Sequence, residues 1–382
     1  MPEQKMTVAV IGATGIAGQQ FLACLPRHPW FKVTALAGSA RSAGKPYAEA
    51  IKSPSGATGW WAEGGVPEEF EGMVIQSSDT FDPGSVDLIF TAVESDVARA
   101  LEPRYAAVTP VVSAASAFRM ETDSPLLIPG VNSDHAALVK DMARKRGWKG
   151  FVTAIPNCHT TGMAIALAPL YRAFGLKTVF MTSMAAVSGA GRSGGVLALD
   201  VMDNLIPYIN GEEEKVQREL SKIFGTFTGG KITPASLAVS CTCTRAGVLE
   251  GHTEVVFADL GVPASVEEVT AAMRAFAPAE LAGLPTAPEA GRLIYVHDDP
   301  FRPQPRLDRD RGDGMVTTVG RVRKDPALPN GVKFVLVSHN TKMGAAKGAV
   351  LLAELLRSQG LLYTRPGPFE HRSASTEGHG QP

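Results

Sequence analysis

The sequence predicts an α/β protein with two halves: a doubly wound, parallel-sheet Rossmann domain at the N-terminus, then an α+β domain. Three observations predict this. Residues 7–11 form a continuous apolar, β-branched run, which is typical of a strand buried on both faces. Glycines at positions 12, 15 and 18 follow it directly and lead into an apolar helical segment. Near residue 155 the pattern changes, and a long amphipathic helix over residues 163–174 begins a second region.

The remaining elements follow in order along the chain. Strands are expected at 32–37, 86–92 and 110–113. Residues 46–85 are less regular, and their segment around Trp60, Trp61, Gly64 and Gly65 is expected to be a loop or an insertion. Strand-like runs lie at 176–187 and 236–262, and the charged stretch 203–224 is expected to be helical beyond Pro207. We predict a first domain over 1–156, completed by a helix within 344–363, a catalytic and dimerisation domain over 157–343, and a disordered tail over 364–382.

The glycine-rich turn is a variant of the dinucleotide-binding fingerprint. Gly12 permits a tight turn, Gly15 lets the backbone approach a pyrophosphate, and Gly18 allows close helix–strand packing, although a plain tight turn is the competing interpretation. We therefore expect the cofactor to bind along one short backbone segment: Gly12, Ala13, Thr14, Gly15 and Ile16.

The sequence after the second expected strand indicates which cofactor is used. NAD-binding versions usually place an acid there for the ribose hydroxyls, and residues 37–45 contain none. Ser39, Arg41 and Ser42 instead offer donors and positive charge suited to a 2′-phosphate, so NADP is predicted, with a plain surface arginine as the alternative for Arg41.

Composition excludes several classes of protein. The 382 residues carry 37 Lys and Arg against 38 Asp and Glu, so no electrostatic footprint for nucleic acid or an acidic membrane is expected. No run of about 18 apolar residues is present, and no secretory signal is visible at the start of the sequence. The 4 Cys are too few for a disulfide framework, so a cytoplasmic enzyme acting on a small molecule is expected.

Cys158 is the best candidate for a nucleophile. It follows Pro156-Asn157 where a helix is expected to begin, and a helix N-terminus lowers the pKa of a thiol. A thiolate needs a proton donor and acceptor nearby, and spacing alone leaves both His252 and His159 open. Cys24, Cys241 and Cys243 are expected to be ordinary buried thiols, and no metal site is predicted.

Taken together, these motifs resemble aspartate-β-semialdehyde dehydrogenase of the archaeal and fungal branch. The likeness runs from about residue 6 to about 360 and is carried by ordered stretches: 12–15, 28–31, 41–45, 156–158, 188–191, 203–209, 251–253, 302–308 and 339–341. The resemblance implies a Rossmann domain plus a catalytic and dimerisation domain, at least a dimer (a homodimer or homotetramer), and NADPH-dependent reduction of an acyl phosphate to an aldehyde through a cysteine thioester.

The resemblance also implies roles for individual residues. It makes Cys158 the nucleophile and His252 the acid–base group. It assigns Arg245 to the substrate carboxylate, Glu219 to the substrate amino group, and Arg119, Asn157 and Lys222 to the phosphate. It places Ser188, Gly189 and Asn340 beside the cofactor.

Several positions depart from the family pattern. Ala185 stands where the family has a glutamine that orients the substrate, and His159 replaces a small hydroxyl residue. Ala114, Gly130 and Met343 replace Asn, Glu and Arg. Three functions therefore stay open: reduction of aspartyl phosphate or a close analogue, reduction of a CoA thioester such as malonyl-CoA or succinyl-CoA, and nucleotide binding without catalysis.

Overall fold

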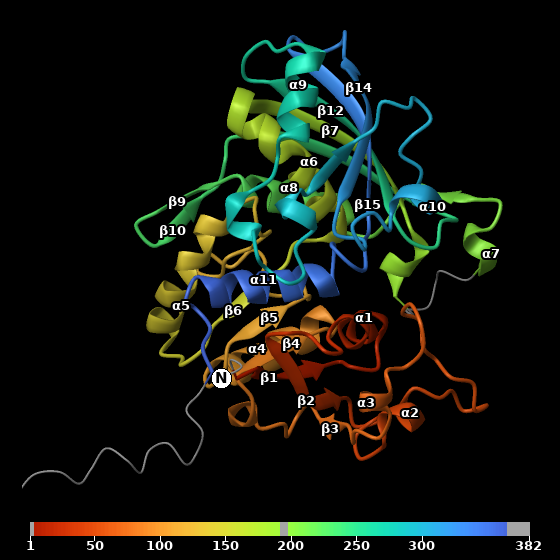
Figure 1. The fold of residues 1–382 in the computed structure, drawn as a ribbon, viewed down its shortest axis with the longest axis vertical. Coiled ribbons are helices and arrows are strands. Elements are labelled where there is room, and N and C mark those ends of the chain that lie inside the picture. Colours follow the sequence, from red (N-terminus) through yellow and green to blue (C-terminus); the bar gives the residue numbers. More distant parts are fainter. Residues whose placement is uncertain (1–3, 192–197, 365–382) are drawn as a thin grey trace, which may run out of the picture.

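The computed structural model describes residues 4–191 and 198–364 and contains two sheets, one in each half of the chain (Figure 1). The first sheet has six strands, all paired in parallel, in the order β3-β2-β1-β4-β5-β6. Their bounds are Gln76–Ser77 (β3), Phe31–Gly38 (β2), Met6–Ile11 (β1), Leu88–Thr91 (β4), Val111–Ser113 (β5) and Val152–Ala154 (β6). This is the strand order of a Rossmann sheet, so the predicted fold class is confirmed.

The helices of this half are α1 (Ile16–Cys24), α2 (Tyr47–Ala50), α3 (Glu68–Glu71), α4 (Ser95–Ala106) and α5 (Leu138–Arg146). The strands β1 and β4 are almost wholly buried, as their unbroken apolar sequences predicted. The expected insertion between the second and third strands contains the short helices α2 and α3. It packs onto the sheet through Tyr47 and Phe70, which are both buried.

The second sheet has seven strands in the order β13-β14-β15-β12-β7-β11-β8 and mixes parallel and antiparallel pairs. Their bounds are Ile294–Val296 (β13), Thr317–Lys324 (β14), Gly331–Ser338 (β15), His252–Leu260 (β12), Leu176–Ala185 (β7), Ala238–Ala246 (β11) and Leu205–Ile206 (β8). A separate hairpin pairs β9 (Thr226–Thr228) with β10 (Lys231–Thr233).

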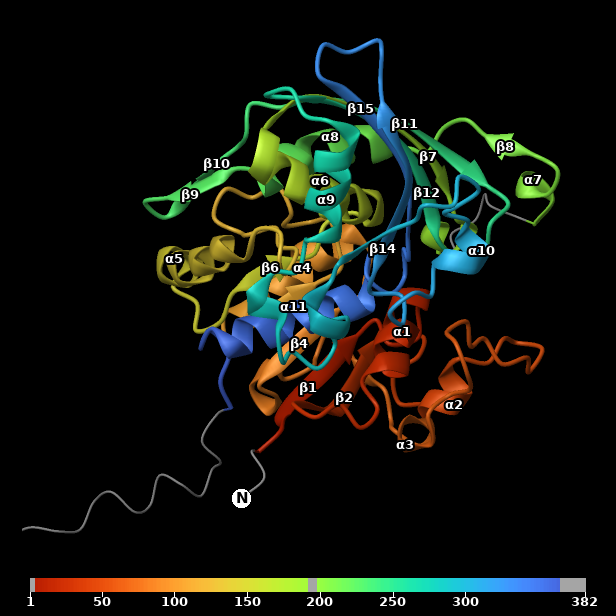
Figure 2. The ribbon, with the colours of Figure 1, turned by 45° about the horizontal axis from the view of Figure 1, so that its top comes forward.

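One face of the second sheet is covered by helices α6 (Cys158–Phe174), α8 (Glu212–Ile223) and α9 (Val266–Arg274) (Figures 1 and 2). The short helices α7 (Ala198–Val201) and α10 (Pro305–Asp308) lie at its margin. Alternate residues of β7 and β11 on the opposite face are exposed, including Phe180, Thr182, Ser240 and Thr242. No helix in the described part of the chain is long and apolar enough to cross a bilayer.

Helix α11 (Ala346–Ser358) lies across the junction of the two halves in both views (Figures 1 and 2). Val350 contributes to the core of the first half, and Leu351 contributes to the core of the second. Its buried Glu354 joins the halves by hydrogen bonding to His28 at 2.8 Å and to the Thr286 backbone N–H at 3.0 Å. The predicted tail lies outside the described residues beyond Thr364.

The glycine-rich turn between β1 and α1 has little free space. Gly12 has φ +83°, and a Cβ there would lie 2.3 Å from the carbonyl oxygen of Ala92. A Cβ on Gly18 would lie 2.1 Å from the Gly12 carbonyl oxygen, so the helix packs directly against the turn. Gly12 and Gly15 therefore have no side chain where α1 begins, which leaves backbone open to a pyrophosphate.

We expect Gly12→Ala to lower the free energy of unfolding by about 2 kcal/mol or more, because left-handed backbone and a steric clash act together. Urea unfolding of the purified protein measures this loss. Gly44→Ala is the matched control, since Gly44 has φ +81° with open space around it. Equal losses in the two variants would show that close packing at Gly12 contributes nothing.

Candidate active site

Cys158 is the first residue of α6 and lines a pocket of about 350 Å³. Asn157 caps the helix by accepting the His159 N–H at its Oδ1, at 2.9 Å. The pocket is lined by residues from four regions of the chain: Cys158, His159, Gly189, Ala190, Ile209, Asn210, Glu212, Lys215, Arg245 and His252. The thiol therefore lies where a helix begins, as predicted, although the helix itself extends further toward the N-terminus than the predicted 163–174.

The predicted lowering of the Cys158 pKa is wrong for this conformation. Burial raises the pKa of the thiol to about 12, the charge of Glu212 adds to the effect, and Arg119 opposes it. The helix N-terminus is present, but removal of the thiolate from water outweighs it. The thiol consequently needs a base to become a nucleophile at neutral pH.

His252, the first residue of β12, lies beside the thiol. Its Nε2 is 3.0 Å from Cys158 Sγ, and its Nδ1 accepts the Ala186 N–H at 3.0 Å. Because Nδ1 accepts a hydrogen bond, the neutral ring carries its proton on Nε2 and donates it to sulfur. Burial, with the charges of His159 and Arg245, holds the pKa of His252 well below its usual value.

Arg245 lies on β11, which β7 separates from β12 in the sheet, and it lines the same pocket. Its Nη1 donates to the Ala186 carbonyl at 2.8 Å, which fixes the guanidinium beside the thiol. Burial lowers the pKa of Arg245 from its ordinary value, yet the group stays cationic. Gly189 lets the backbone lie against this pair, since a Cβ there would be 3.1 Å from His252 Cε1.

Three other predicted substrate residues form a buried cluster outside the pocket lining. Glu219 accepts Arg119 Nη1 at 3.0 Å and the Asn157 N–H at 2.7 Å. Lys222 Nζ donates to three carbonyls, those of Arg119, Glu121 and Ser124, at 2.7 Å each. All three ammonium hydrogens are therefore used, and in this arrangement Lys222 anchors a loop instead of presenting a free charge to phosphate.

Sequence reasoning missed Glu212, which lines the pocket from the start of α8. Its Oε2 accepts Asn157 Nδ2 at 2.6 Å, and its Oε1 accepts Lys215 Nζ at 2.8 Å. Helical periodicity carried the signal, because Val216, Leu220 and Ile223 are buried and Glu212 lies one turn before Val216. In the run Glu212-Glu213-Glu214, the first two side chains turn inward, Glu212 to the pocket and Glu213 to the Cys243 N–H, and Glu214 is exposed.

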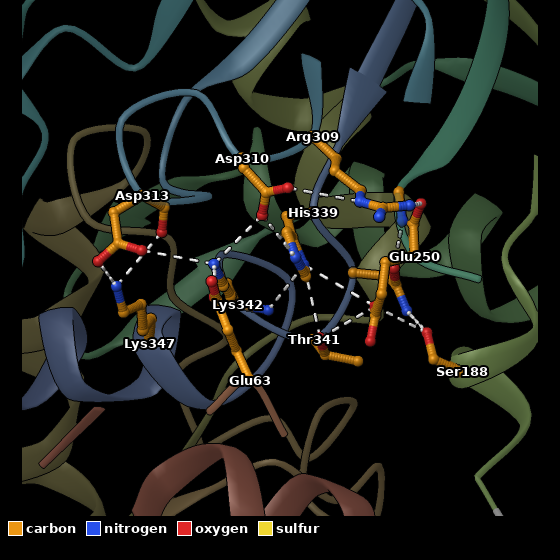
Figure 3. A network of polar contacts seen from close by, with 12 residues as sticks. Glu63, Ser188, Glu250, Arg309, Asp310, Asp313, His339, Thr341, Lys342 and Lys347 are labelled. Carbon is orange, nitrogen blue, oxygen red and sulfur yellow. Dashed lines mark hydrogen bonds and ion pairs between the residues drawn. The ribbon is translucent and has the colours of Figure 1, made fainter. Parts of the chain in front are cut away.

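The predicted cofactor residues of the second half belong to a polar network beside the pocket (Figure 3). Asn340 accepts the Gly251 N–H at 2.8 Å and donates to Ser188 Oγ at 2.7 Å, and Ser188 donates to Glu250 at 2.8 Å. Burial raises the pKa of Glu250.

The same network reaches the first half through Lys342. Its Nζ lies 2.9 Å from Glu63 and 3.2 Å from Asp310 (Figure 3). Ser188 and Asn340 are thus held in a fixed geometry between the halves.

The predicted cofactor residues of the first half lie on the turn and on the loop after β2. Ser42 is buried and donates to the Ser39 carbonyl at 3.0 Å, which shapes the loop. Arg41 is exposed, and within residues 4–191 and 198–364 no side chain pairs with its guanidinium. An exposed arginine in the loop after β2 is suited to a phosphate group of a dinucleotide.

Cys158, His159 and His252 each place one potential ligand atom within 4.8 Å of the others. A metal-bound histidine normally donates its second ring N–H to an acceptor. His252 instead presents Nδ1 to a backbone N–H, so this trio does not fit a metal centre.

The residues that depart from the family pattern have different surroundings in the structure. Ala185 ends β7, is fully buried and pairs with Arg245 of β11. Gly130 has φ +83° and packs against Pro278, which suits glycine. The Ala114 carbonyl accepts Arg119 Nη2 at 3.1 Å, and Met343 is buried.

A parallel sheet with a glycine-rich turn, joined to a domain with a histidine beside a cysteine thiol, is the arrangement found in dinucleotide-dependent enzymes that work through a thioester. Two family models match the chain: "Semialdehyde dehydrogenase, NAD binding domain" over residues 7–139 and "Semialdehyde dehydrogenase, dimerisation domain" over residues 167–343. The chain belongs to the semialdehyde dehydrogenase family.

Similar proteins cover almost the whole chain. Aspartate-semialdehyde dehydrogenase of Methanothermobacter thermautotrophicus is 44% identical over 92% of this chain and 99% of its own length. The crystal structure of the Candida albicans enzyme with NADP has a TM-score of 0.83 and 37% identity, over 94% of this chain and 100% of that one. Malonyl CoA reductase (NADP) of Metallosphaera sedula is 34% identical over 94% of this chain and 99% of its own.

Proposed function

We propose that this protein is an NADP-dependent aspartate-semialdehyde dehydrogenase that reduces aspartyl 4-phosphate, or a close acyl phosphate, through a thioester on Cys158. One observation carries the proposal: the Cys158 thiol lies 3.0 Å from His252 Nε2, in a pocket that also contains a fixed arginine. Full-length likeness to enzymes of that name supports it.

In this reaction the thiolate attacks the acyl carbon, and phosphate leaves as the thioester forms. The Arg245 guanidinium is placed to hold the substrate carboxylate, and the His252 Nε2–H to donate a hydrogen bond to developing charge. NADP, when bound as NADPH, supplies the hydride that reduces the thioester. Arg119, Asn157 and Glu219 lie behind the pocket and are the residues from which phosphate and amino-group contacts are expected, whereas Lys222 would first have to release its three carbonyl partners.

The second candidate function is reduction of a CoA thioester. Ala185 favours it, because an alanine cannot make the substrate hydrogen bond of the glutamine that the family has at this position, and a malonyl-CoA reductase is among the similar proteins. A steady-state assay separates the two. NADPH formation from NADP, phosphate and aspartate semialdehyde supports the aspartate-semialdehyde dehydrogenase. NADPH oxidation by malonyl-CoA or succinyl-CoA, with no activity on aspartate semialdehyde, would instead support the CoA-thioester reductase.

We also propose that the chain divides at residues 156/157 and 343/344 and assembles as a homodimer. The exposed face of β7 and β11 around Phe180 supports this, and so does the match to a dimerisation domain over 167–343. Sedimentation of the purified protein tests the assembly, and a monomer at working concentration would contradict it.

We expect Arg41→Ala to raise the KM for NADP about 10- to 100-fold and to leave the KM for NAD unchanged. The reason is that a charged hydrogen bond to the 2′-phosphate is lost and only NADP carries that group. Initial rates with each cofactor measure the effect. Lys52→Ala, which removes another exposed cation of the first half, serves as the control. An equal rise in the KM for NADP and the KM for NAD would show that Arg41 does not contact the 2′-phosphate.

A further inference from the structure

Glu250 joins two loops beside the predicted cofactor residues of the second half. Its side chain is 16% exposed, and it lies two positions before His252. Its Oε2 accepts the Ser188 hydroxyl at 2.8 Å and the Thr341 hydroxyl at 3.1 Å (Figure 3). One carboxylate oxygen therefore holds the loop after β7 and the loop after β15 together.

The hydrogen bonds that lead to Glu250 can run in only one direction. The Gly251 backbone N–H is a donor, so the Asn340 side-chain atom 2.8 Å from it must be the amide oxygen. Asn340 Nδ2 then donates to Ser188 Oγ at 2.7 Å, which leaves the Ser188 hydroxyl proton for Glu250. Among the described residues, the Glu250 carboxylate is the one acceptor of that proton.

Asn340 is thereby left with one free N–H in a fixed orientation. Its oxygen and its other N–H are engaged, and within residues 4–191 and 198–364 Nδ2 has no second partner, although the residue is only 3% exposed. Asn340 lies next to the nucleophile, since a Cβ on Gly344 would be 2.9 Å from Cys158 Cβ and 3.1 Å from Asn340 Cα. A hydride can reach an acyl carbon on Cys158 only from a ring beside this thiol, so Asn340 borders the nicotinamide end of a bound dinucleotide.

The role of Glu250 as an acceptor does not depend on its charge. Burial raises the pKa of Glu250, whereas the hydrogen bonds from Ser188 and Thr341 lower it. The charges of Arg309 and Lys342 also oppose burial. Oε2 accepts both hydroxyls whether or not Oε1 carries a proton, so the direction of the hydrogen bonds is the same in either state.

We propose that Glu250 is a positioning residue of the cofactor site: it accepts the Ser188 hydroxyl proton and so reserves the free Asn340 N–H for the carboxamide oxygen of the nicotinamide. Glu250 acts through Ser188 and Asn340 and does not itself contact the cofactor. Without the carboxylate, the Ser188 hydroxyl is free to donate to Asn340, and the amide loses its fixed orientation. The inference rests on the proposed function only in taking NADP as the cofactor.

Cofactor binding in the absence of substrate tests this role. Adenosine 2′,5′-bisphosphate carries the adenine end and the 2′-phosphate of NADP but has no nicotinamide. We expect Glu250→Ala to raise the Kd for NADP about 3- to 10-fold, as the loss of one hydrogen bond does, and to leave the Kd for the bisphosphate unchanged. Calorimetric titration of the purified protein measures both constants. A general loss of stability would weaken the two ligands alike.

Further variants separate positioning from an effect on the fold. Glu250→Gln should restore the parent Kd for NADP, because an amide oxygen in the same place can accept both hydroxyls. Ser188→Ala removes the hydroxyl between Glu250 and Asn340, so adding Glu250→Ala to it should raise the Kd no further. Glu267→Ala, which removes an exposed glutamate of α9, is the control and should change neither constant.

An unchanged Kd for NADP in Glu250→Ala would overturn the proposal, and so would an equal rise for the bisphosphate or an additive rise in the double variant. A parent protein that binds NADP but does not turn over aspartate semialdehyde would lose the proposed function, while the predicted changes in Kd would still support the role of Glu250. Activity on aspartate semialdehyde together with an unchanged Kd in Glu250→Ala would do the reverse.

Discussion

Replacing Cys158 with serine is expected to reduce turnover of aspartate semialdehyde on the order of 10⁴-fold or more. A serine hydroxyl in the same position is a far weaker nucleophile than the thiol, and His252 Nε2 offers it a proton where it would need an acceptor. NADPH formation in the presence of phosphate measures the loss.

Cofactor binding supplies the control for this variant. Cys158→Ser should bind NADP as the parent does, because the glycine turn and Arg41 are untouched, and titration of intrinsic fluorescence measures this. Cys241→Ser is the matched variant, since Cys241 is buried in β11 and does not line the pocket. Full activity of Cys158→Ser would contradict the thioester mechanism.

His252→Asn is expected to lower kcat/KM by about 10²- to 10⁴-fold. The asparagine Oδ1 can take over the Ala186 N–H that Nδ1 accepts, so the strand end is preserved while the donor to Cys158 Sγ is lost. Initial rates over a range of semialdehyde concentrations, with a circular-dichroism spectrum to confirm folding, measure the effect.

His297→Asn provides the comparison for His252→Asn. His297 bonds to Asp308 at 2.8 Å, well outside the pocket lining, and its replacement should leave kcat/KM unchanged. An equal fall in both variants would mean that His252 supports the fold and does not act on the substrate.

Most of the fold could be predicted because the apolar residues of this chain recur with the spacing of a strand or a helix, and the structure buries those same residues. The run 7–11 is buried as β1, the 163–174 pattern lies within α6, and the last periodic segment is α11. The second sheet could not be ordered from sequence, since β7 pairs with both β11 and β12 and such long-range pairing leaves no local signal.

The residues of the site could be predicted from the sequence, but their pKa values and ionic contacts could not. Cys158 and His252 lie 94 positions apart in sequence, and only the family resemblance linked them. The pKa of Cys158 is raised because the thiol is buried. Lys222 has no ammonium hydrogen left for a phosphate because three loop carbonyls accept them all. Both are products of tertiary packing, which a local motif such as a helix start does not encode.

The most direct measurement is a single-turnover reaction of the protein with NADP and aspartate semialdehyde, with and without phosphate, followed by intact mass and peptide mapping. Without phosphate, we predict one NADPH per active site and an acyl group on Cys158; adding phosphate should discharge it and start steady turnover. Steady turnover without phosphate, or an acyl group on another residue, would contradict the account.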